Sequence, residues 1–379
     1  MDMKNRLPAV FMRGGTSKAL MFHLRDLPAD RNEWKDLFLR AMGSPDPYGR
    51  QLNGMGGGIS SLSKVCVIAP SARADADIDY TFVQVAVRDA QIDMSGNCGN
   101  MLSAIGPFAV DEYLVVPEMG HTTVRIFNTN TSKLVHARFP TDAEGTVYGG
   151  NCIIPGVAGS GAPIRLDFLD PGGATTGKLL PTGIPSEQLK VDGVELEVSM
   201  IDAGNACVFV RAEDLGVLGT ALPAQISEQP DLLRLLESIR IAASMRMRIS
   251  KDRDNAMLIR HVPFIVIVSG PQDALTTSGE WIRAADMNLT ARVISNGQPH
   301  QALPLTATLC TTIAARIHGS IVNRVASTTD HGPFNVGMPS GILSADAEIT
   351  LDDRGPVAKR GSFFRTARRL FKGGLYIED

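Results

Sequence analysis

Aromatic side chains are scarce in this chain: Phe, Tyr and Trp make up 6% of its 379 residues. Proteins that bind single-stranded nucleic acids use such rings for base stacking, so this class is disfavoured. A charge excess is also lacking, because 37 Lys and Arg against 40 Asp and Glu leave a net charge of −3. We therefore expect no nucleic-acid partner.

Long apolar stretches are missing as well. The longest run of aliphatic and aromatic residues, Phe264 to Val268, falls far short of the roughly 20 apolar residues of a membrane-spanning helix. It predicts a buried strand. The N-terminal residues show no signal-peptide pattern. We expect a cytoplasmic protein that does not bind a membrane.

The cysteine and histidine patterns indicate neither a disulfide framework nor a metal site. The five cysteines are odd in number and widely spaced, and none forms a Cys-x-x-Cys pair. The seven histidines are equally scattered. We expect free thiols, as in a reducing compartment, and no bound metal.

Glycine, in contrast, is plentiful. The 37 Gly and 22 Pro indicate tight turns and places where the backbone closely approaches another group. An apolar share of 44% and a charged share of 20% are ordinary for a globular protein. At about 150 residues per domain, the length predicts two to three domains.

The chain has two halves with a similar order of elements, which indicates an internal duplication. The first half has strand patterns at Ala9 to Met12 and Lys64 to Ile68, with a helix pattern at Trp34 to Ala41 between them. The second has strand patterns at Val198 to Ile201 and Phe264 to Val268, with a helix pattern at Asp231 to Ala243 between them. We predict two α+β domains, residues 1–190 and 191–379.

Each half also contains a stretch of small and apolar residues with almost no charge. These stretches are Met101 to Val110 and Cys310 to Arg316, the second reached through Leu303 to Leu309. A helix without a polar face is buried on all sides. We therefore predict two pseudo-symmetric domains, each a curved, mostly antiparallel sheet around one central helix.

Two cysteines, Cys98 and Cys310, are predicted to stand where these helices begin. The macrodipole and the unpaired N–H groups of a helix N-terminus favour a thiolate, which acts as proton acceptor or nucleophile. The same N–H groups hold an anion such as a carboxylate. Cys66, Cys152 and Cys207 lie in or beside apolar strands, so we interpret them as buried small side chains.

A glycine cluster at residues 54–58 leads through three serines to Lys64. It is no phosphate-binding loop, because the Gly-x-x-x-x-Gly-Lys spacing is absent and the lysine enters a strand. A lysine at the edge of a buried strand is a candidate general base, since burial favours the neutral amine. The alternative is a surface lysine whose stem alone is covered.

Two basic clusters admit two interpretations. They are Arg246 to Arg253 and Lys359 to Lys372, the latter including Arg365 and Arg369. Such charges either steer an anionic substrate or lie on a solvated surface. The slightly acidic balance of the whole chain favours the surface interpretation.

Three motifs, taken together in this order, are more specific. They are Met12-Arg13-Gly14-Gly15-Thr16-Ser17-Lys18, Gly54-Met55-Gly56-Gly57 with Ser63-Lys64, and Ser95-Gly96-Asn97-Cys98-Gly99-Asn100. In combination they resemble the methylaconitate isomerase (PrpF-type) family, which includes aconitate Δ-isomerases and 4-oxalomesaconate isomerases or tautomerases. The resemblance spans nearly the whole chain. It implies the diaminopimelate-epimerase fold, with the active site between two domains.

The same resemblance implies a reaction without cofactor: a 1,3-proton shift that moves a double bond in an unsaturated di- or tricarboxylate such as aconitate or 2-methylaconitate. It assigns the acid–base pair to Lys64 and Cys98, and leaves open which is the base in the forward direction. The substrate-binding residues expected are Gly15, Thr16, Ser17, Gly56, Gly57, Asn97, Gly99, Asn100, Cys310 and Thr311.

Three alternatives stay open. Cys98 and Cys310 could form the thiol pair of a racemase or epimerase on the same fold, a mechanism that has no need of Lys64. The chain could instead be a 4-oxalomesaconate tautomerase, or a binding protein without activity. The partner expected is a small polycarboxylate, and the sequence leaves open whether the chain forms a homodimer.

Overall fold

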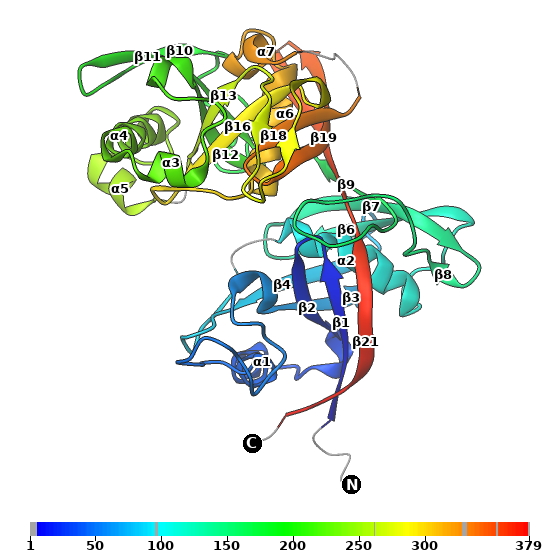
Figure 1. Cartoon of the computed structure of the whole chain (residues 1–379). Coiled ribbons are helices and arrows are strands. Elements are labelled where there is room, and N and C mark those ends of the chain that lie inside the picture. The colour runs from blue at the N-terminus through cyan, green and yellow to red at the C-terminus, as the bar shows by residue number, and fades with distance from the viewer. Residues whose placement is uncertain (1–5, 95–97, 261, 328–331, 354, 378–379) are drawn as a thin grey trace. The chain divides into compact units, whose positions relative to one another are not determined.

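The chain is divided into two compact units. The computed structural model describes residues 6–94, 98–260, 262–327, 332–353 and 355–377. Unit 1 comprises residues 1–168 and 364–379, and unit 2 comprises residues 169–363. The chain passes from unit 1 to unit 2 within β9 (Ile164–Leu169) and returns at the end of β20 (Gly355–Arg365). The colours of Figure 1 follow this path.

The predicted boundary between residues 190 and 191 needs correction at both ends. β10 (Glu187–Val191) pairs with β11 (Val194–Ala203), so the segment before residue 191 belongs to unit 2. β21 (Ala367–Tyr376) pairs along its length with β1 (Arg6–Gly14), which brings the C-terminal strand back into unit 1. This pairing joins strands at opposite ends of the chain, and no local sequence pattern reports it.

Unit 1 is built on a mostly antiparallel sheet. Its strand order is β21–β1–β2–β3–β4–β6–β7–β9, and only the third and fifth pairings, β2–β3 and β4–β6, are parallel. The other strands of this unit are β2 (Ser17–His23), β3 (Lys64–Pro70), β4 (Ile78–Val85), β5 (Ile92–Asp93), β6 (Gly120–Asn128), β7 (Lys133–Asp142) and β8 (Gly145–Thr146).

Unit 2 repeats this plan. Its strand order is β10–β11–β12–β13–β16–β18–β19–β20, and again only the third and fifth pairings are parallel. Its further strands are β12 (Asn205–Arg211), β13 (Phe264–Ser269), β14 (Ala274–Leu275), β15 (Trp281–Ile282), β16 (Leu289–Ser295), β17 (Gln298–Pro299), β18 (Phe334–Met338) and β19 (Gly341–Asp352). The identical sequence of strand directions confirms the predicted duplication and the α+β class.

The helix α2 (Gly99–Asp111) is the centre of unit 1. All residues from Met101 to Val110 are buried, and the first charged side chain of the helix is Asp111. A Cβ at Gly106 would lie 2.6 Å from the Phe139 ring, so glycine at this position lets α2 pack closely on β7. The absence of charge along the helix is thus explained by burial against the sheet, as predicted.

The corresponding helix of unit 2, α6 (Leu305–Arg316), begins earlier than predicted. Cys310 is its sixth residue and fully buried, so the prediction that a cysteine opens this helix is wrong. Pro304 is the residue that precedes the first turn. Proline is tolerated at a helix start because its missing N–H would be unpaired there, and Leu305 to Leu309 then continue the buried face.

The remaining helices cover the sheets. α1 (Trp34–Met42) matches its prediction, and Gly43 ends it at a φ of 76°. α4 (Pro230–Arg246) contains the predicted helix 231–243. The short helices are α3 (Pro223–Ser227), α5 (Arg253–Leu258) and α7 (Ile321–Val325). Among the described residues, no helix combines the length and apolarity needed to cross a membrane.

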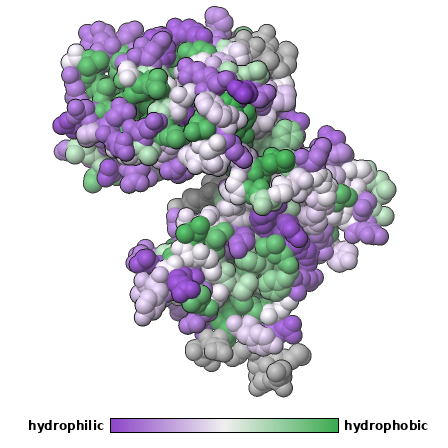
Figure 2. Space-filling view, viewed as in Figure 1, coloured by the Kyte–Doolittle hydropathy of each residue, from purple (hydrophilic) through white to green (hydrophobic). Residues whose placement is uncertain are grey.

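The first basic cluster lies on the surface, as the favoured interpretation expects. Arg246, Arg248, Lys251 and Arg253 are all exposed at or near the ends of α4 and α5. Figure 2 shows that hydrophilic residues are plentiful over this part of unit 2. Arg246 also forms an ion pair with Glu187. This cluster is therefore solvated charge.

Candidate active site

Lys64 is a buried lysine at the first position of β3. Its side chain points to the face of the sheet that carries α2, and the residue is only 7% exposed. The ammonium group donates a hydrogen bond to Gln84 Oε1 at 2.5 Å and lies 5.1 Å from the centroid of the Phe82 ring. Among the described residues, its polar and ring contacts are therefore one neutral acceptor and one ring face, not a surface environment.

Gln84 is itself held in one orientation. Its amide Nε2 donates to the backbone carbonyls of Ser63 at 2.8 Å and Ser60 at 3.0 Å. Because the two donors of the amide are used there, its oxygen faces Lys64. The strand register, which pairs Lys64 directly with Gln84, sets this arrangement.

Cys98 is the N-cap residue of α2. Its backbone is extended, with φ −112° and ψ 97°, and its carbonyl accepts the first helical hydrogen bond from Leu102. Its side chain does not cap the helix, and it is only partly buried against the core of unit 1. The thiol therefore stands at the N-terminal end of α2, whose first-turn N–H groups have no partner within the helix and stabilise an anion.

Cys66 links Lys64 and Cys98. It lies two residues beyond Lys64, on the same face of β3, and it is fully buried with its Sγ 3.9 Å from the Tyr80 hydroxyl. Burial raises the pKa of the Cys66 thiol, nearby Cys98 raises it further, and nearby Lys64 lowers it. Cys98 packs against the core that contains Cys66, so both proposed acid–base groups border the α2 side of the unit 1 sheet.

The first glycine cluster packs against the start of α2. A Cβ at Gly14 would lie 2.7 Å from the Asn100 carbonyl oxygen, and a Cβ at Gly15 would overlap the Asn100 side chain. Gly15 also has a φ of 52°, which disfavours other residues. Asn100 Nδ2 donates to Thr16 Oγ1 at 3.1 Å. The β1–β2 turn and the helix start thus form one assembly, with Ser17 buried at the first position of β2.

Arg365 joins this assembly, and the prediction of solvated charge is wrong for it. It is 7% exposed, and its Nε donates to Asn100 Oδ1 at 3.2 Å. Burial lowers the pKa of its guanidinium to about 10, so it stays charged at neutral pH. The sequence contained a signal for this burial. Phe363 and Ala367 stand two residues before and two residues after Arg365, so in an extended strand they share its face, and both are buried.

The second glycine cluster is shaped by contacts within the chain. A Cβ at Gly56 would overlap the side chain of Gln51, and one at Gly57 would lie 2.7 Å from Leu62. Gln51 is buried and donates to Ser63 Oγ at 2.7 Å. The need for glycine at both positions is thus explained without a ligand, although the loop is anchored next to Lys64.

The predicted residues of unit 2 are buried. Cys310 Sγ donates to the Ile201 carbonyl at 3.4 Å, and Thr311 Oγ1 donates to the Ala307 carbonyl at 2.8 Å. Both side chains are fully inaccessible and use their hydrogens inside this unit. At the start of α6, Thr306 Oγ1 instead accepts from Asn205 Nδ2 at 3.1 Å.

The predicted site residues thus fall into two groups. In unit 1, Gly15 and Asn100 lie against Arg365, and Thr16 is bonded to Asn100. Cys98 stands at the start of the same helix, and Lys64 lies on the face of the sheet that carries this helix. In unit 2, Cys310 and Thr311 are buried and inaccessible. Asn97 lies outside the described residues. Within those residues, no group of three or more His, Cys, Asp or Glu side chains is arranged to hold a metal ion.

Known proteins resemble the chain along its whole length. A family model described as "PrpF protein" matches residues 4–378. The 3-methylitaconate isomerase of Eubacterium barkeri is 39% identical, covering 100% of this chain and 99% of that protein. The 2-methyl-aconitate isomerase of Cupriavidus necator is 36% identical, covering 98% and 97%. The 4-oxalomesaconate tautomerase of Pseudomonas putida is 38% identical, covering 99% and 97%.

Solved structures agree with these sequence matches. A methylitaconate-delta-isomerase is similar with a TM-score of 0.91 at 38% identity, covering 98% of this chain and 96% of that one. A hydroxyproline epimerase from Agrobacterium vitis is similar with a TM-score of 0.53 at 11% identity, covering 100% and 95%. This second match concerns the fold alone. The fold is therefore of the racemase and epimerase kind.

Proposed function

The chain belongs to the PrpF protein family and is an isomerase, and from this premise we propose that it moves a carbon–carbon double bond within an unsaturated di- or tricarboxylate by a 1,3-proton transfer. Lys64 and Cys98 are the acid–base pair of this proposal. The observation that supports it is that Cys98 packs against the core containing Cys66, which lies two residues after Lys64 on the same face of β3.

The reaction needs two proton-transfer groups at separate positions. One group removes a proton from the carbon next to the double bond, and the electron pair of that C–H bond delocalises through the double bond to a carboxylate as a dienolate. The other group then delivers a proton two carbons away, and the double bond has moved. No net electron is gained or lost. Lys64 from β3 and Cys98 from the start of α2 supply such a pair from two different elements.

The carboxylates of the substrate need positive partners. Arg365 provides a guanidinium that is already held by Asn100, and the free N–H groups of the first turn of α2 provide further donors. Thr16 keeps the Asn100 amide in place. The same donors stabilise the negative charge that develops on the dienolate.

The two-cysteine alternative receives less support. The N-cap of α6 is Pro304, and the thiol of Cys310 is buried with its hydrogen bonded to a backbone carbonyl. An epimerase would need a second accessible thiol, whereas the double-bond shift needs Lys64. Which unsaturated carboxylic acid is the substrate is tested by the four acids named below.

Deuterium incorporation tests the proposal. The protein is incubated in D₂O with aconitate, 2-methylaconitate, methylitaconate and 4-oxalomesaconate, and proton NMR reports which carbon exchanges. We expect exchange at the allylic carbons of at least one acid, abolished in Lys64→Met and in Cys98→Ala. Lys35→Met, at an exposed position of α1, is the matched control and keeps full activity.

Two results would contradict the proposal. Wild-type protein that exchanges none of the four acids would identify a binding protein. A Lys64→Met variant that keeps activity while Cys310→Ala loses it would identify the two-cysteine mechanism.

A further inference from the structure

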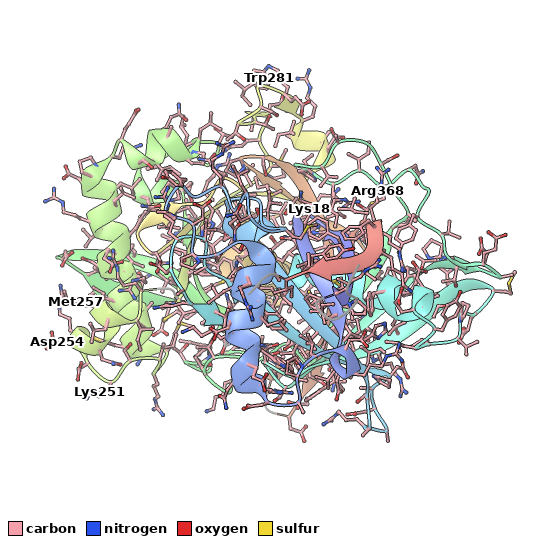
Figure 3. The ribbon with its side chains drawn as sticks, turned by 90° about the horizontal axis from the view of Figure 1, so that it is seen from below. Lys18, Lys251, Asp254, Met257, Trp281 and Arg368 are labelled. Carbon is pink, nitrogen blue, oxygen red and sulfur yellow. The ribbon has the colours of Figure 1, made fainter. Side chains whose placement is uncertain are left out.

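Three cations form a row across the outer part of the unit 1 sheet. Arg13 on β1 pairs directly with Lys18 on β2 and with Arg368 on β21. Directly paired residues of neighbouring antiparallel strands have their side chains on the same face, with Cβ atoms about 5 Å apart. Figure 3 labels Lys18 and Arg368, which lie near each other at the same end of these strands.

The row has no acidic counterpart in the described part of the chain. Arg13 donates to the carbonyls of Gly15 and Thr366, both at 2.9 Å, and to Thr366 Oγ1 at 3.1 Å, so its partners are neutral. Burial and the neighbouring Arg368 lower the pKa of Arg13 below its usual value. Like charges directly opposite each other destabilise a sheet, so this arrangement calls for an anion.

A cavity of about 260 Å³ lies against this row. Arg13 and Arg368 line it, together with the loop from Val157 to Gly161 and with Thr366. The volume lies below the range of about 300–1,000 Å³ that drug-sized ligands occupy, so the ligand is a small one. Gly159 and Ser160 belong to this lining, and their backbone N–H groups have no acceptor among the described residues.

We propose that Arg13 and Arg368 form, with the Val157–Gly161 loop, a binding site for a small oxyanion of two or more negative charges, and that Lys18 beside Arg13 adds to its positive charge. The side chains of the row lie on the other face of β1 from the start of α2, while the cavity also reaches Tyr148 and Ala367 of the core around α2. Gly14 faces the start of α2, and Arg13, one residue earlier, therefore faces away from it. The proposal does not depend on the isomerase reaction.

Two sources of such an anion share this chemistry: inorganic phosphate and a free polycarboxylate. Both present several oxygens to guanidinium groups, which bind them with paired hydrogen bonds. Phosphate fits a small cavity lined by two guanidinium groups. A polycarboxylate would place at least one carboxylate there, and the experiment separates the two.

The first test measures the unfolding temperature in phosphate and in chloride at equal ionic strength and pH. A ligand that binds only the folded state raises this temperature, and the rise grows with the logarithm of its concentration above the dissociation constant. We expect phosphate to raise it for the wild type and for Arg25→Glu, a matched charge reversal at an exposed position of unit 1. Arg368→Glu should abolish the effect, and its unfolding temperature in chloride should rise, because the new carboxylate pairs with Arg13.

Calorimetric titration compares the two sources. For the wild type we expect phosphate to bind with a dissociation constant that weakens as salt is added, and Lys18→Gln to weaken binding at least fivefold. Tricarballylate, a saturated tricarboxylate that cannot isomerise, would show one more binding event in the wild type than in Arg368→Glu if it is the natural ligand.

Isomerase kinetics complete the test. Arg368→Glu should keep the KM and kcat of the wild type, because Arg368 lies outside the acid–base assembly. The proposal is overturned if neither anion distinguishes the wild type from Arg368→Glu. It is also overturned if Arg368→Glu loses isomerase activity while remaining folded, since the row would then belong to the active site.

Discussion

The side-chain amide of Asn100, the second residue of α2, donates a hydrogen bond to the hydroxyl of Thr16 at 3.1 Å. In unit 2 the second residue of α6, Thr306, accepts the same kind of bond from Asn205 at 3.1 Å, with donor and acceptor exchanged. In each unit the turn residue that forms this bond comes directly after a glycine with a positive φ, Gly15 in unit 1 and Gly204 in unit 2. The duplicated fold therefore fixes each hairpin turn to its central helix by the same device.

The Asn100–Thr16 bond should matter for substrate binding more than for stability. Thr16→Val keeps the shape and removes the hydroxyl, which is exposed, so we expect a loss of only about 1 kcal/mol in the free energy of unfolding. The freed Asn100 no longer orients Arg365, and KM should rise about tenfold, equivalent to about 1.4 kcal/mol. Thr16→Ser keeps the hydroxyl and should restore KM. An unchanged KM in Thr16→Val would separate this turn from the substrate.

Arg365 should be needed for its fork of donors as well as for its charge. Arg365→Lys keeps one positive charge but cannot hold Asn100 and a carboxylate with paired N–H groups. We expect KM to rise at least tenfold in steady-state assays, with a smaller change in kcat. Arg246→Lys, on the solvated surface of α4, is the control and should behave as the wild type. Equal kinetics for both variants would remove Arg365 from the site.

Thiol labelling distinguishes Cys98 from the three fully buried cysteines. Cys66, Cys207 and Cys310 are fully buried, and burial raises the pKa of the Cys66 and Cys207 thiols, so they stay protonated and unreactive. Iodoacetamide should modify Cys98 first in the native protein, as peptide mass spectrometry reports. Tricarballylate should slow this modification. Faster labelling of Cys310 than of Cys98 would contradict the described packing of α6.

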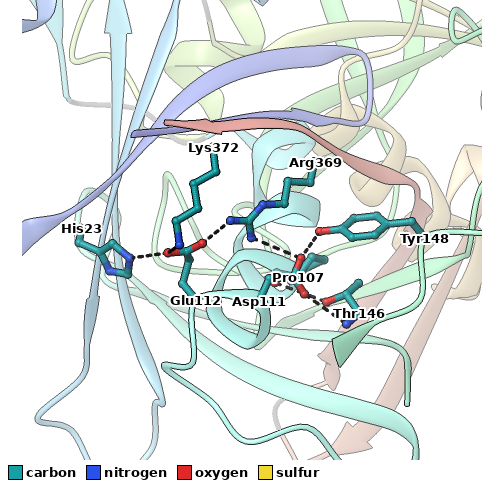
Figure 4. A network of polar contacts seen from close by, with 8 residues as sticks. All are labelled: His23, Pro107, Asp111, Glu112, Thr146, Tyr148, Arg369 and Lys372. Atoms are coloured by element: carbon teal, nitrogen blue, oxygen red, sulfur yellow. Dashed lines mark hydrogen bonds and ion pairs between the residues drawn. The ribbon is translucent and has the colours of Figure 1, made fainter. Parts of the chain in front are cut away.

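Glu112, at the C-terminal end of α2, should make unit 1 sensitive to acid. Figure 4 shows this carboxylate bonded to His23, Arg369 and Lys372, with His23 Nε2 at 3.2 Å and Lys372 Nζ at 2.8 Å. Burial opposes its ionisation, but the bonds from Lys372, Arg369 and His23 outweigh it, so its pKa lies below the usual value. A carboxyl of lowered pKa stabilises the fold above its unfolded pKa of about 4.3.

The stabilisation by Glu112 is therefore complete at neutral pH and is lost as the pH falls below about 4. Glu112→Gln should lower the free energy of unfolding at pH 7 by about 3 kcal/mol, because it leaves Arg369 and Lys372 without their charge partner. Between pH 7 and pH 3 its stability should fall less than that of the wild type. Denaturant unfolding at both pH values measures this difference, and parallel losses in the two proteins would refute it.

Much of the fold followed from local patterns. The uncharged stretch from Met101 to Val110 is buried along its whole length, because a helix lacking a polar face can be stable only inside a core. The order of strands and helices indicated the duplication before any pairing was known. Cys98 precedes such a helix directly, so its place at the N-cap also followed from the sequence.

Other features depend on residues far apart in the chain. The sequence did not show that Cys310 lies inside α6. The helix begins at Leu305, directly after Pro304, and no glycine near Cys310 indicated where the helix starts. Nor could the sequence show that β21 returns to β1, since strand pairing is a contact between distant segments. The predicted boundary at residue 190 failed for this reason.

The sequence by itself determined which side chains we propose for the chemistry: Lys64 at the start of a strand and Cys98 before a buried helix. Their residue types and local positions are properties of short segments. Only the tertiary structure decided that Arg365, separated from Asn100 by 265 positions, lies buried against it. It also decided that Arg13 stands between Lys18 and Arg368. The physical reason is that burial and charge proximity arise from packing, which joins segments that no local pattern relates.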